Sequence, residues 1–578
     1  MNLFDVADFY INKIVTSQSK LSVANVNEHQ RIKVLLLDKN TTPTISLCAT
    51  QSELLKHEIY LVERIENEQR EVSRHLRCLV YVKPTEETLQ HLLRELRNPR
   101  YGEYQIFFSN IVSKSQLERL AESDDLEAVT KVEEIFQDFF ILNQDLFSFD
   151  LQPRKFLSNK LVWSEGGLTK CTNSLVSVLL SLKIKPDIRY EGASKICERL
   201  AKEVSYEIGK NERTFFDFPV MDSTPVLLIL DRNTDPITPL LQPWTYQSMI
   251  NEYIGIKRNI VDLSKVPRID KDLEKVTLSS KQDAFFRDTM YLNFGELGDK
   301  VKQYVTTYKD KTQTNSQINS IEDIKNFIEK YPEFRKLSGN VAKHMAIVGE
   351  LDRQLKIKNI WEISEIEQNL SAHDANEEDF SDLIKSLQNE AVDKYYKLKL
   401  ACIYSLNNQT SSDKIRQLVE VLSQQLPPED VNFFHKFKSL FSRQDKMTQS
   451  NHDKDDILTE LARRFNSRMN SKSNTAAENV YMQHIPEISS LLTDLSKNAL
   501  SRDRFKEIDT QGHRVIGNQQ SKDIPQDVIL FVIGGVTYEE ARLVHDFNGT
   551  MNNRMRVVLG GTSILSTKEY MDSIRSAK

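Results

Sequence analysis

The chain of 578 residues is long enough for about three or four domains, which excludes a single small module. Hydrophobic residues make up 39% of it and charged residues 28%, values typical of folded soluble chains, so extensive disorder is not expected. The formal net charge of −6 provides no overall positive field, which excludes nucleic-acid binding through bulk charge.

The amino-terminal residues show no targeting segment. The apolar positions of MNLFDVADFYINKIV are interrupted by Asp5, Asp8 and Lys13, so we expect neither a signal peptide nor a transit peptide. No window approaches the roughly 18 consecutive apolar residues of a membrane-spanning helix, so membrane contact is expected only through partners. The cysteines lie far apart and form no CxxC motif, which predicts a cytoplasmic, reduced protein without disulfides or a zinc site. They are Cys48, Cys78, Cys171, Cys197 and Cys402.

In the first third of the chain, short aliphatic runs alternate with helical patterns, which predicts βαβ units and a parallel sheet. The strands are expected at residues 33–38, 78–84 and 104–110. After the first strand, apolar residues at helical spacing predict a helix that begins near Ser52. These residues are Leu55, Ile59, Val62 and Ile65. A further helix is predicted from Thr85 until Pro99 stops it.

The rest of the chain predicts a helical domain inserted into an α/β domain. Three uninterrupted apolar runs are typical of strands in the centre of a sheet covered on both faces. They lie at residues 226–232, 527–535 and 555–561. Between them, from about Thr245 to Asn479, helical patterns dominate. Three polar segments of this insertion are expected to be mobile loops. They are residues 371–382, 444–456 and 466–479.

Two pairs of glycines follow predicted strands, in FVIGGVTY and VVLGGTS. A strand that ends in glycines can form a phosphate-binding turn, but neither pair gives GxGxxG or GxxxxGK[ST]. A tight turn from strand to helix is therefore the favoured interpretation of both pairs.

The candidate catalytic residues have structural interpretations. Asp231 and Asp235 are close enough to act as paired carboxylates, but the adjacent Arg232 favours a structural ion pair with capping hydrogen bonds. The eleven histidines form no HExxH motif, and no GxSxG motif is present. His57, His91, His344 and His435 are interpreted as helix-surface or core residues. We predict no catalytic residue, no metal and no cofactor.

A helix is predicted in SQLERLAESDD, residues 115–125, with Ser115 and Glu118 as a capping box. Leu117, Leu120 and Ala121 form an apolar edge on this helix. This edge either faces the sheet or lies open on the surface. The following stretch VTKVEEIFQDFFIL has helical spacing but the β-branched and aromatic composition of a strand, so its structure stays open.

The stretch from Phe327 to Leu355 is a long amphipathic pattern with Pro332 near its start. Proline removes a backbone donor and clashes with the preceding turn, so it ends or kinks a helix there. Two interpretations stay open: a packed helical hairpin with a structural kink, and a hinge that lets the hairpin extend and bind another helix.

Several blocks together resemble one known family. They are KVLLLDKNTTPTISLCATQSELLKHEIYLVERIE, RNPRYGEYQIFFSN, LLILDRNTDPITPLLQPWTYQSM, ILFVIGGVTYEEA and VVLGGTSIL. Blocks like these occur in the same order in the SM family, the Sec/Munc-type proteins that bind syntaxins. They extend from about residue 33 to residue 565, so the chain resembles an SM protein over nearly its whole length. Within the family it is most similar to the vacuolar protein-sorting class, in its fungal form.

The resemblance implies an arch-shaped molecule of three domains. Two would be α/β domains with parallel sheets, and a large, mainly helical domain would be inserted in the second. Domain one would be residues 1–130 and would bind syntaxin. Domain two would combine residues 131–245 with 483–578. Domain three would be residues 246–482 and would template SNARE helices.

The resemblance also implies sites. Carried over by position, a pocket for an amino-terminal syntaxin peptide would be lined by Leu117, Leu120, Ala121, Val132 and Ile135. Such a pocket accepts one aromatic or aliphatic anchor, and charged flanks set the register of the peptide. This implication favours the exposed alternative for the edge of the predicted helix 115–125.

Three further positions match functional positions of SM proteins. Glu63 matches an acidic position of the syntaxin cleft, but Pro43 and Thr50 stand where neuronal members carry basic residues. The neuronal style of grip on closed syntaxin is therefore not expected here. Pro332 matches the hairpin proline, and Met345 matches an apolar position of the SNARE groove. A structural signature comprises Asp231, Arg232, Asp235 and Trp244, and we expect Trp244 to pack in the interior.

The function implied is that of a non-enzymatic protein that binds a trans-Golgi or endosomal syntaxin and promotes SNARE complex assembly in vesicle docking and fusion. It would act in transport from the Golgi to endosomes and the vacuole. The implied partners are that syntaxin and its SNARE complex, with a v-SNARE and a Rab-effector tether as further candidates. The protein would be a cytoplasmic monomer, peripherally associated with Golgi, endosomal and vesicle membranes. The alternatives are a nucleotide-regulated α/β enzyme and a tethering scaffold without SNARE preference.

Overall fold

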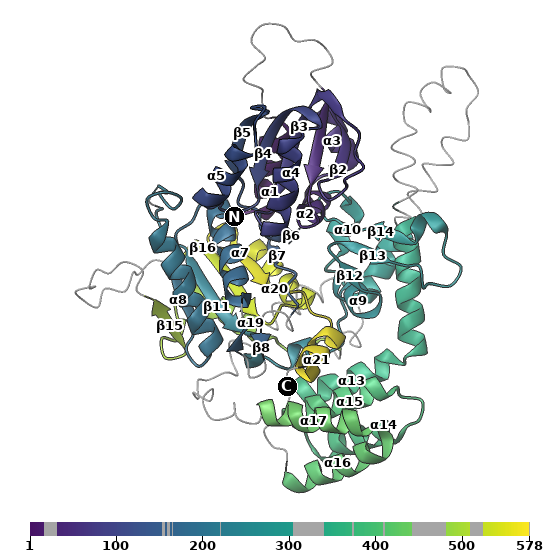
Figure 1. Ribbon diagram of the computed structural model, residues 1–578. Helices are drawn as coiled ribbons and strands as arrows, with labels where there is room; N and C mark the ends of the chain where they lie inside the picture. The colour runs from purple at the N-terminus through teal and green to yellow at the C-terminus, as the bar shows by residue number, and fades with distance from the viewer. Residues whose placement is uncertain are drawn as a thin grey trace, which may run out of the picture. The chain divides into compact units, whose positions relative to one another are not determined.

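The computed structural model divides into two compact units (Figure 1). It describes residues 1–16, 32–152, 157–158, 162–164, 166–219, 221–303, 340, 342–372, 375–407, 411–441, 481–508 and 524–576. The first unit comprises Met1–Leu230, Ser501–Ile533 and Asn548–Ser563. The second comprises Asp231–Leu500, Gly534–Phe547 and Ile564–Lys578. Each unit is therefore assembled from segments that lie far apart in the sequence.

The first unit contains a five-stranded parallel sheet in the order β2-β1-β3-β4-β5. Its strands are β1 (Lys33–Leu37), β2 (Ile59–Arg64), β3 (Ser73–Val82), β4 (Tyr101–Phe108) and β5 (Val129–Glu134). The helices around it are α1 (Leu3–Val15), α2 (Thr41–Cys48), α3 (Gln51–Lys56), α4 (Glu86–Arg97) and α5 (Lys114–Glu122). Leu89 and Leu92 of α4 and Leu120 of α5 join Val34, Val80 and Ile106 in one core cluster, so these two helices cover the same face of the sheet.

A second sheet of seven strands in the first unit has the order β15-β10-β11-β16-β17-β7-β6. Its strands are β6 (Phe140–Asn143), β7 (Leu146–Ser148), β10 (Asp187–Glu191), β11 (Val226–Asp231), β15 (Phe505–Ile508), β16 (Asp527–Ile533) and β17 (Arg556–Gly561). The helices α7 (Gly167–Leu182) and α8 (Lys195–Lys210) and the short hairpin of β8 (Leu157–Ser158) and β9 (Val162–Trp163) complete this part. The late strands β16 and β17 lie between the earlier β11 and β7, as their yellow colour among blue strands shows (Figure 1).

The second unit is mainly helical. It has a small antiparallel sheet of β12 (Ile256–Lys257), β13 (Ile260–Asp262) and β14 (Lys275–Thr277). Its helices are α9 (Tyr246–Tyr253), α10 (Ala284–Thr289), a helix over residues 342–357, α13 (Ile360–Ala372), α14 (Glu377–Gln388), α15 (Lys394–Ser405), α16 (Ser412–Gln425), α17 (Pro428–Phe441), α19 (Glu487–Ser496) and α21 (Thr567–Ser576). Helix α20 (Tyr538–Met551) begins in this unit and ends in the first. The carboxyl-terminal α21 adds Tyr570 and Met571 to the helical core.

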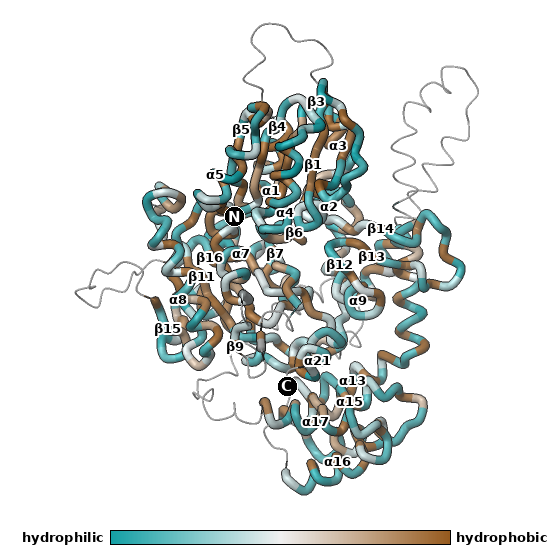
Figure 2. Tube along the Cα trace, in the orientation of Figure 1, coloured by the Kyte–Doolittle hydropathy of each residue, from teal (hydrophilic) through white to brown (hydrophobic). Residues whose placement is uncertain are grey.

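Hydropathy accounts for this arrangement. The strands β1 and β16 are brown over most of their length, whereas the helices change between brown and teal (Figure 2). A strand in the middle of a parallel sheet is covered on both faces and needs a continuous apolar run, but a helix needs only one apolar face. Helix α15 is the exception, because every residue from Tyr396 to Tyr404 is buried in the core of the second unit.

The predicted fold class, parallel α/β sheets with a mainly helical insertion, is confirmed. Strands are present at all six predicted places, and α4 ends at Arg97, just before Pro99. The four predicted domain segments stay a prediction.

The helix predicted from Ser52 is wrong over most of its length. Helix α3 ends at Lys56, and Ile59–Arg64 form the parallel strand β2 beside β1. Tyr60, Leu61 and Val62 are exposed in this strand, so the apolar residues at helical spacing do not form one buried face. Pairing with β1 outweighed the local helical spacing.

The two pairs of glycines have different roles. Gly534 and Gly535 follow β16 with φ angles of 104° and 108°, which favour glycine, so the tight turn predicted there is present. Gly560 and Gly561 instead lie within β17, and the turn predicted at this pair is wrong. A Cβ atom on Gly560 would lie 2.0 Å from Cζ of Phe147 on the next strand, so glycine is needed there because the ring occupies that space.

One predicted loop is partly helical. Residues 377–382 belong to α14, whose N-cap Asn376 forms a capping box with Asp379. The acidic residues that suggested a solvated loop stabilise the first turn of this helix instead. The loops predicted at residues 444–456 and 466–479 lie outside the described residues.

We expect Gly560→Ala to destabilise the protein by about 1–3 kcal/mol or more, because the new methyl group overlaps the Phe147 ring. Urea unfolding measures this loss. The matched control is Gly549→Ala in α20, where a Cβ meets no atom within 4 Å. Alanine favours a helix, so this variant is expected to be as stable as the original or up to about 1 kcal/mol more stable. Equal stability of both variants would contradict the packing role of Gly560.

Candidate protein-binding site

Helix α5 begins two residues earlier than the predicted capping box implied. The hydroxyl of Ser113 accepts a hydrogen bond from the Gln116 backbone N at 3.3 Å, and the Gln116 side chain accepts one from the Ser113 N at 2.9 Å. The predicted box of Ser115 and Glu118 is therefore wrong. An N-cap residue needs extended backbone angles, which Ser113 has, whereas Ser115 already lies in the first turn of the helix.

The apolar edge of α5 is divided between the core and the surface. Leu120 is buried in the core cluster with Ile106 of β4. Leu117 and Ala121 lie one turn apart on the neighbouring face and are exposed, and Leu117 exposes 39% of its surface. Leu120 of this edge therefore faces the sheet, whereas Leu117 and Ala121 lie open on the surface.

The stretch VTKVEEIFQDFFIL, whose structure the sequence left open, begins with β5, an edge strand of the five-stranded sheet, and ends in β6 of the seven-stranded sheet. Val132 lies opposite Ile106 in the parallel ladder, so it is on the sheet face that α5 covers, and it is 45% exposed. Ile135 follows the end of the strand, is fully buried, and is not in the cluster that contains Leu120. The structure therefore gathers Leu117, Leu120, Ala121 and Val132 on one face and leaves Ile135 out. We call Leu117, Ala121 and Val132 the α5–β5 surface.

Charged groups flank this surface. Arg119 of α5 donates to both carboxylate oxygens of Glu86, at 2.7 and 3.0 Å, and these hydrogen bonds lower the pKa of Glu86 to about 2. The Lys131–Glu133 pair of β5, 2.9 Å apart, alternates with Val132 and so lies on the opposite face of the sheet. Glu134 accepts a hydrogen bond from the Val112 N at 2.8 Å, and burial raises its pKa. The surface is thus an apolar area bordered by charges of both signs.

The predicted cleft position Glu63 lies in β2, half-buried, next to the exposed Tyr60, Leu61 and Val62. Thr50 accepts from the Glu53 N and caps α3, and Pro43 lies in α2. Thr50, a neutral capping residue, and Pro43 thus occupy the two positions where neuronal members of the family carry basic residues.

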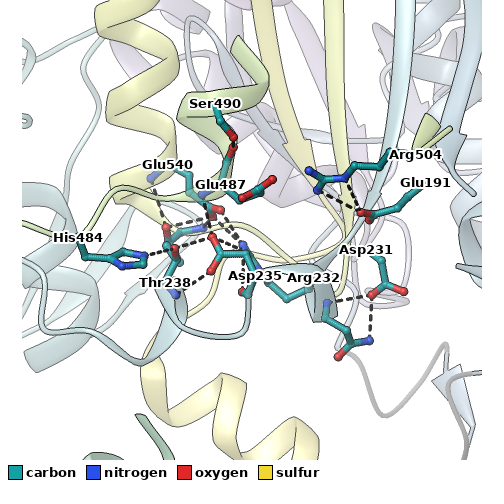
Figure 3. Close-up of polar contacts among 12 residues, drawn as sticks. Glu191, Asp231, Arg232, Asp235, Thr238, His484, Glu487, Ser490, Arg504 and Glu540 are labelled. Atoms are coloured by element: carbon teal, nitrogen blue, oxygen red, sulfur yellow. Dashed lines mark hydrogen bonds and ion pairs between the residues drawn. The ribbon is translucent and has the colours of Figure 1, made fainter. Parts of the chain in front are cut away.

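Two of the signature residues, Arg232 and Asp235, form a buried ionic network in the second unit (Figure 3). Arg232 donates through Nη1 to both oxygens of Glu540, at 2.7 and 2.9 Å, and its Nη2 lies 3.3 Å from Asp235 Oδ2. All three side chains are at most 10% exposed. The ion pair predicted between Arg232 and a neighbouring aspartate is present. Arg232 has a second carboxylate partner, Glu540, which the sequence did not suggest.

Asp235 extends this network to the start of α19. Its carboxylate accepts from the Thr238 hydroxyl at 2.6 Å and from the Glu487 N at 3.2 Å. The Thr238 hydroxyl also lies 3.2 Å from Nε2 of His484. Burial alone would raise the pKa of Asp235, but Arg232, His484 and these hydrogen bonds hold it below its ordinary value. The network stabilises a structure and presents no accessible reactive group.

The remaining predicted residues have the following places. Trp244 is buried, donates from Nε1 to Ser364 at 2.8 Å and stacks on Trp361 with the ring centroids 4.1 Å apart, which is the packing role expected of it. Asp231 accepts from the Asn233 N at 2.9 Å at the end of β11. Met345 lies on the helix 342–357 and is 51% exposed. Pro332 lies outside the described residues.

Across the described parts of the chain, no helix has the length and apolar character needed to cross a membrane. Within the same residues, no group of three or more histidine, cysteine, aspartate or glutamate side chains is placed to hold a metal ion.

Comparison with known proteins identifies the family. The model described as "Sec1 family" matches residues 33–573. The chain belongs to the Sec1 family. It is 99% identical, over the full length of both chains, to vacuolar protein sorting-associated protein 45 of Saccharomyces cerevisiae. It is 38% identical to the Homo sapiens protein of the same name, over 94% of this chain and 92% of that protein.

Solved structures of Sec1-family proteins have the same fold. "SM Protein Vps45 in Complex with Qa SNARE Tlg2 (1-310)" matches with a TM-score of 0.87 and 40% identity, over 100% of this chain and 98% of that chain. Sly1p in complex with an N-terminal peptide of Sed5p matches with a TM-score of 0.77 at 19% identity, over 100% of this chain and 99% of that chain, a likeness that shows the fold alone. The resemblance to SM proteins of the vacuolar protein-sorting class is thereby confirmed.

We expect Glu540→Ala to lower the free energy of unfolding by about 3–5 kcal/mol, because the buried Arg232 would lose its bidentate partner. Urea unfolding at neutral pH measures this loss. Arg416→Ala removes one partner of an exposed ion pair with Asp413 and is expected to change stability by less than about 1 kcal/mol. A Glu540→Ala variant as stable as the control would show that the ion pair has no net stabilising role.

Proposed function

We propose that this chain is a non-enzymatic SM protein that binds a syntaxin-type Qa SNARE of trans-Golgi and endosomal membranes and promotes assembly of its SNARE complex in vesicle fusion. The observation that carries the proposal is the likeness over the whole chain to Vps45, a protein solved in complex with the Qa SNARE Tlg2. Membrane association is peripheral and follows the syntaxin. Residues 1–130 form the syntaxin-binding domain, residues 131–245 and 483–578 form the second domain, and residues 246–482 form the SNARE-templating domain.

The α5–β5 surface is the proposed site for the amino-terminal peptide of the syntaxin. Leu117 and Val132 are large apolar side chains that stay exposed beside the buried Leu120, which makes them available to a partner. An aromatic or aliphatic residue of the peptide packs against them, and the flanking charges set its register. Leu120 supports the site from the core, and Ile135 has no contact role.

The helix 342–357 is the proposed surface for SNARE helices. His344, Ile347 and Leu351 recur at helical spacing and are buried, so the opposite side of the helix carries Met345 to solvent. An apolar side chain on an exposed helix face is the element that a helix-in-groove contact uses. Holding partner helices in register lowers the entropic cost of starting a helical bundle, so assembly is accelerated without covalent chemistry.

Leu117→Arg is expected to weaken binding of the syntaxin amino-terminal peptide at least about thirtyfold, which corresponds to the roughly 2 kcal/mol lost with an interface anchor. Fluorescence anisotropy with a labelled peptide measures the affinity. Tyr206→Arg is the matched control, because Tyr206 is a larger and more exposed side chain on α8, away from this surface. Loss of binding in both variants, or in neither, would contradict the assignment of the α5–β5 surface. Persistent binding in Leu117→Arg would favour a scaffold that holds its partners elsewhere.

The non-enzymatic assignment is tested with nucleotides. A Cβ on Gly534 would lie 2.6 Å from Cβ of Arg232, and the ring of Phe147 occupies the corresponding space at Gly560, so the glycines accommodate protein atoms. We therefore expect ATP, GTP and Mg²⁺ to leave the unfolding temperature unchanged. A ligand at a hundred times its dissociation constant would stabilise the fold by about 2.7 kcal/mol, so a shift of several degrees would favour the nucleotide-regulated enzyme instead.

A further inference from the structure

A buried cluster of titratable side chains lies beside the proposed SNARE-binding helix. His344 is only 1% exposed, and its Nε2 lies 2.8 Å from Oδ2 of Asp283. Its Nδ1 lies 2.9 Å from the hydroxyl of Tyr246. Lys343 donates to the same Asp283 oxygen at 2.5 Å. None of these residues takes part in the ionic network around Arg232.

The cluster joins three elements of the second unit. Tyr246 is the first residue of α9, and Asp283 is the N-cap of α10, where it also accepts from the Phe286 N at 3.1 Å. Lys343 and His344 belong to the helix 342–357, and Lys343 also donates to the carbonyl of Thr277 at the end of β14. The beginning of the described helix is thereby attached to α9, α10 and β14.

The two distances fit a neutral imidazole with its proton on Nε2. In this form Nε2–H donates to Asp283, and Nδ1 accepts from the Tyr246 hydroxyl. A second proton, on Nδ1, would turn Nδ1 into a donor, so the Tyr246 hydroxyl would have to rotate and accept from it. It would also add a cation beside Lys343, which already neutralises Asp283.

The titratable and charged groups that face His344 are Tyr246 from α9, Asp283 from the start of α10 and Lys343 from its own helix. Burial lowers the pKa of His344 below 6.5, Lys343 acts in the same direction, and Asp283 opposes them without reversing the shift. The phenyl ring of Phe285 lies 4.6 Å from the imidazole and that of Phe286 6.4 Å, so the cluster is enclosed by apolar groups.

We propose that Asp283, His344 and Tyr246 form a proton-sensitive clamp that positions the helix 342–357 and the partner-binding face it presents. The inference rests on the proposed function for the identity of the partner. Met345 follows His344 directly and points to solvent while His344 is held inside, so the clamp fixes the rotation at which Met345 is offered to a SNARE helix. His344 is a positioning residue, because it acts through the helix and does not contact the partner.

The expected pH response has a definite sign. Because the clamped state disfavours the charged imidazole, the clamp is fully stable above about pH 6.5, the ordinary histidine value, and weakens as the pH falls below it. If the opened state titrates with that ordinary value, lowering the pH to about 5.5 increases the ratio of open to closed clamp by at most about tenfold.

The test is amide hydrogen exchange of the full chain at about pH 7.5 and 5.5, with rates corrected for the intrinsic pH dependence of exchange. We expect opening of the helix 342–357 to increase by up to about tenfold at the lower pH in the original protein. His344→Gln keeps an amide donor near the position of Nε2 but does not titrate, so its opening should be the same at both values. His484→Gln, at a half-buried histidine of the second unit whose pKa burial also lowers, is the matched control and should respond like the original protein.

A second variant keeps the proposal testable if His344→Gln does not fold. Tyr246→Phe removes the hydroxyl that contacts Nδ1 of His344, so the pH midpoint of opening should shift. Identical pH responses of the original protein and His344→Gln would overturn the clamp. So would a midpoint in Tyr246→Phe identical to that of the original protein.

Binding of a labelled SNARE-motif peptide, measured by anisotropy on the same proteins, tests the positioning role. We expect its affinity to fall with clamp opening in the original protein and to stay constant in His344→Gln, while Met345→Glu weakens binding at both pH values. Opening that leaves peptide affinity unchanged would overturn the positioning role. Absence of peptide binding at about pH 7.5 would refute the proposed function, whereas the exchange experiment would still decide whether the clamp exists.

Discussion

The pairing of Arg232 with Glu540 is the interaction on which the organisation of the second unit depends. A guanidinium that is 6% exposed is tolerated only if its charge and hydrogen bonds are matched, and Glu540 supplies a bidentate partner across 308 positions of sequence. The pair therefore joins the segments that follow two neighbouring strands, β11 and β16. Asp235 then continues the network to α19, so three distant segments share one buried group of charges.

Several buried charged side chains in the described parts of the chain lie in ion pairs. Lys399 and Glu367 have no exposed surface and lie 2.6 Å apart inside the helical core. In the first unit, Glu95 is buried and receives hydrogen bonds from Arg70, Arg100 and Tyr104. Buried pairs of this kind add less to stability than the same volume of apolar side chains, but each one requires particular segments to meet.

Local sequence was sufficient to predict the central strands and the helix 86–97, because their apolar patterns are long and their ends are marked by Thr85 and Pro99. It was insufficient where pairing with a distant segment decides the outcome. The residues of β2 have helical spacing, and only the neighbouring β1 makes them a strand. The glycines of β17 looked like a turn, since nothing nearby in sequence reveals the Phe147 ring that fills the space beside Gly560.

For the candidate site, too, the local patterns could be predicted from the sequence, and the contacts with distant segments could not. The apolar edge of α5 could be read from spacing, but its division into buried Leu120 and exposed Leu117 depends on the packing of α5 against the sheet. The burial of Ile135 could not be read from the sequence, because it depends on where β5 ends. Thr537 and Glu540 form a capping motif in the sequence, which indicates the start of a helix but not the ion pair with Arg232. The partners of His344 likewise come from segments about 60 and 98 positions away.

The strand order of the seven-stranded sheet has a consequence for how the protein is made. In that sheet β11 pairs with β10 on one side, and its other neighbour, β16, is synthesised about 300 residues later, which takes roughly 15–60 s at ordinary rates of translation. During that interval the apolar edge of β11 has no partner strand, while the five-stranded sheet, complete by residue 134, has all its strands available. The nascent chain therefore carries an open sheet edge on the ribosome, which favours aggregation until β16 has been synthesised.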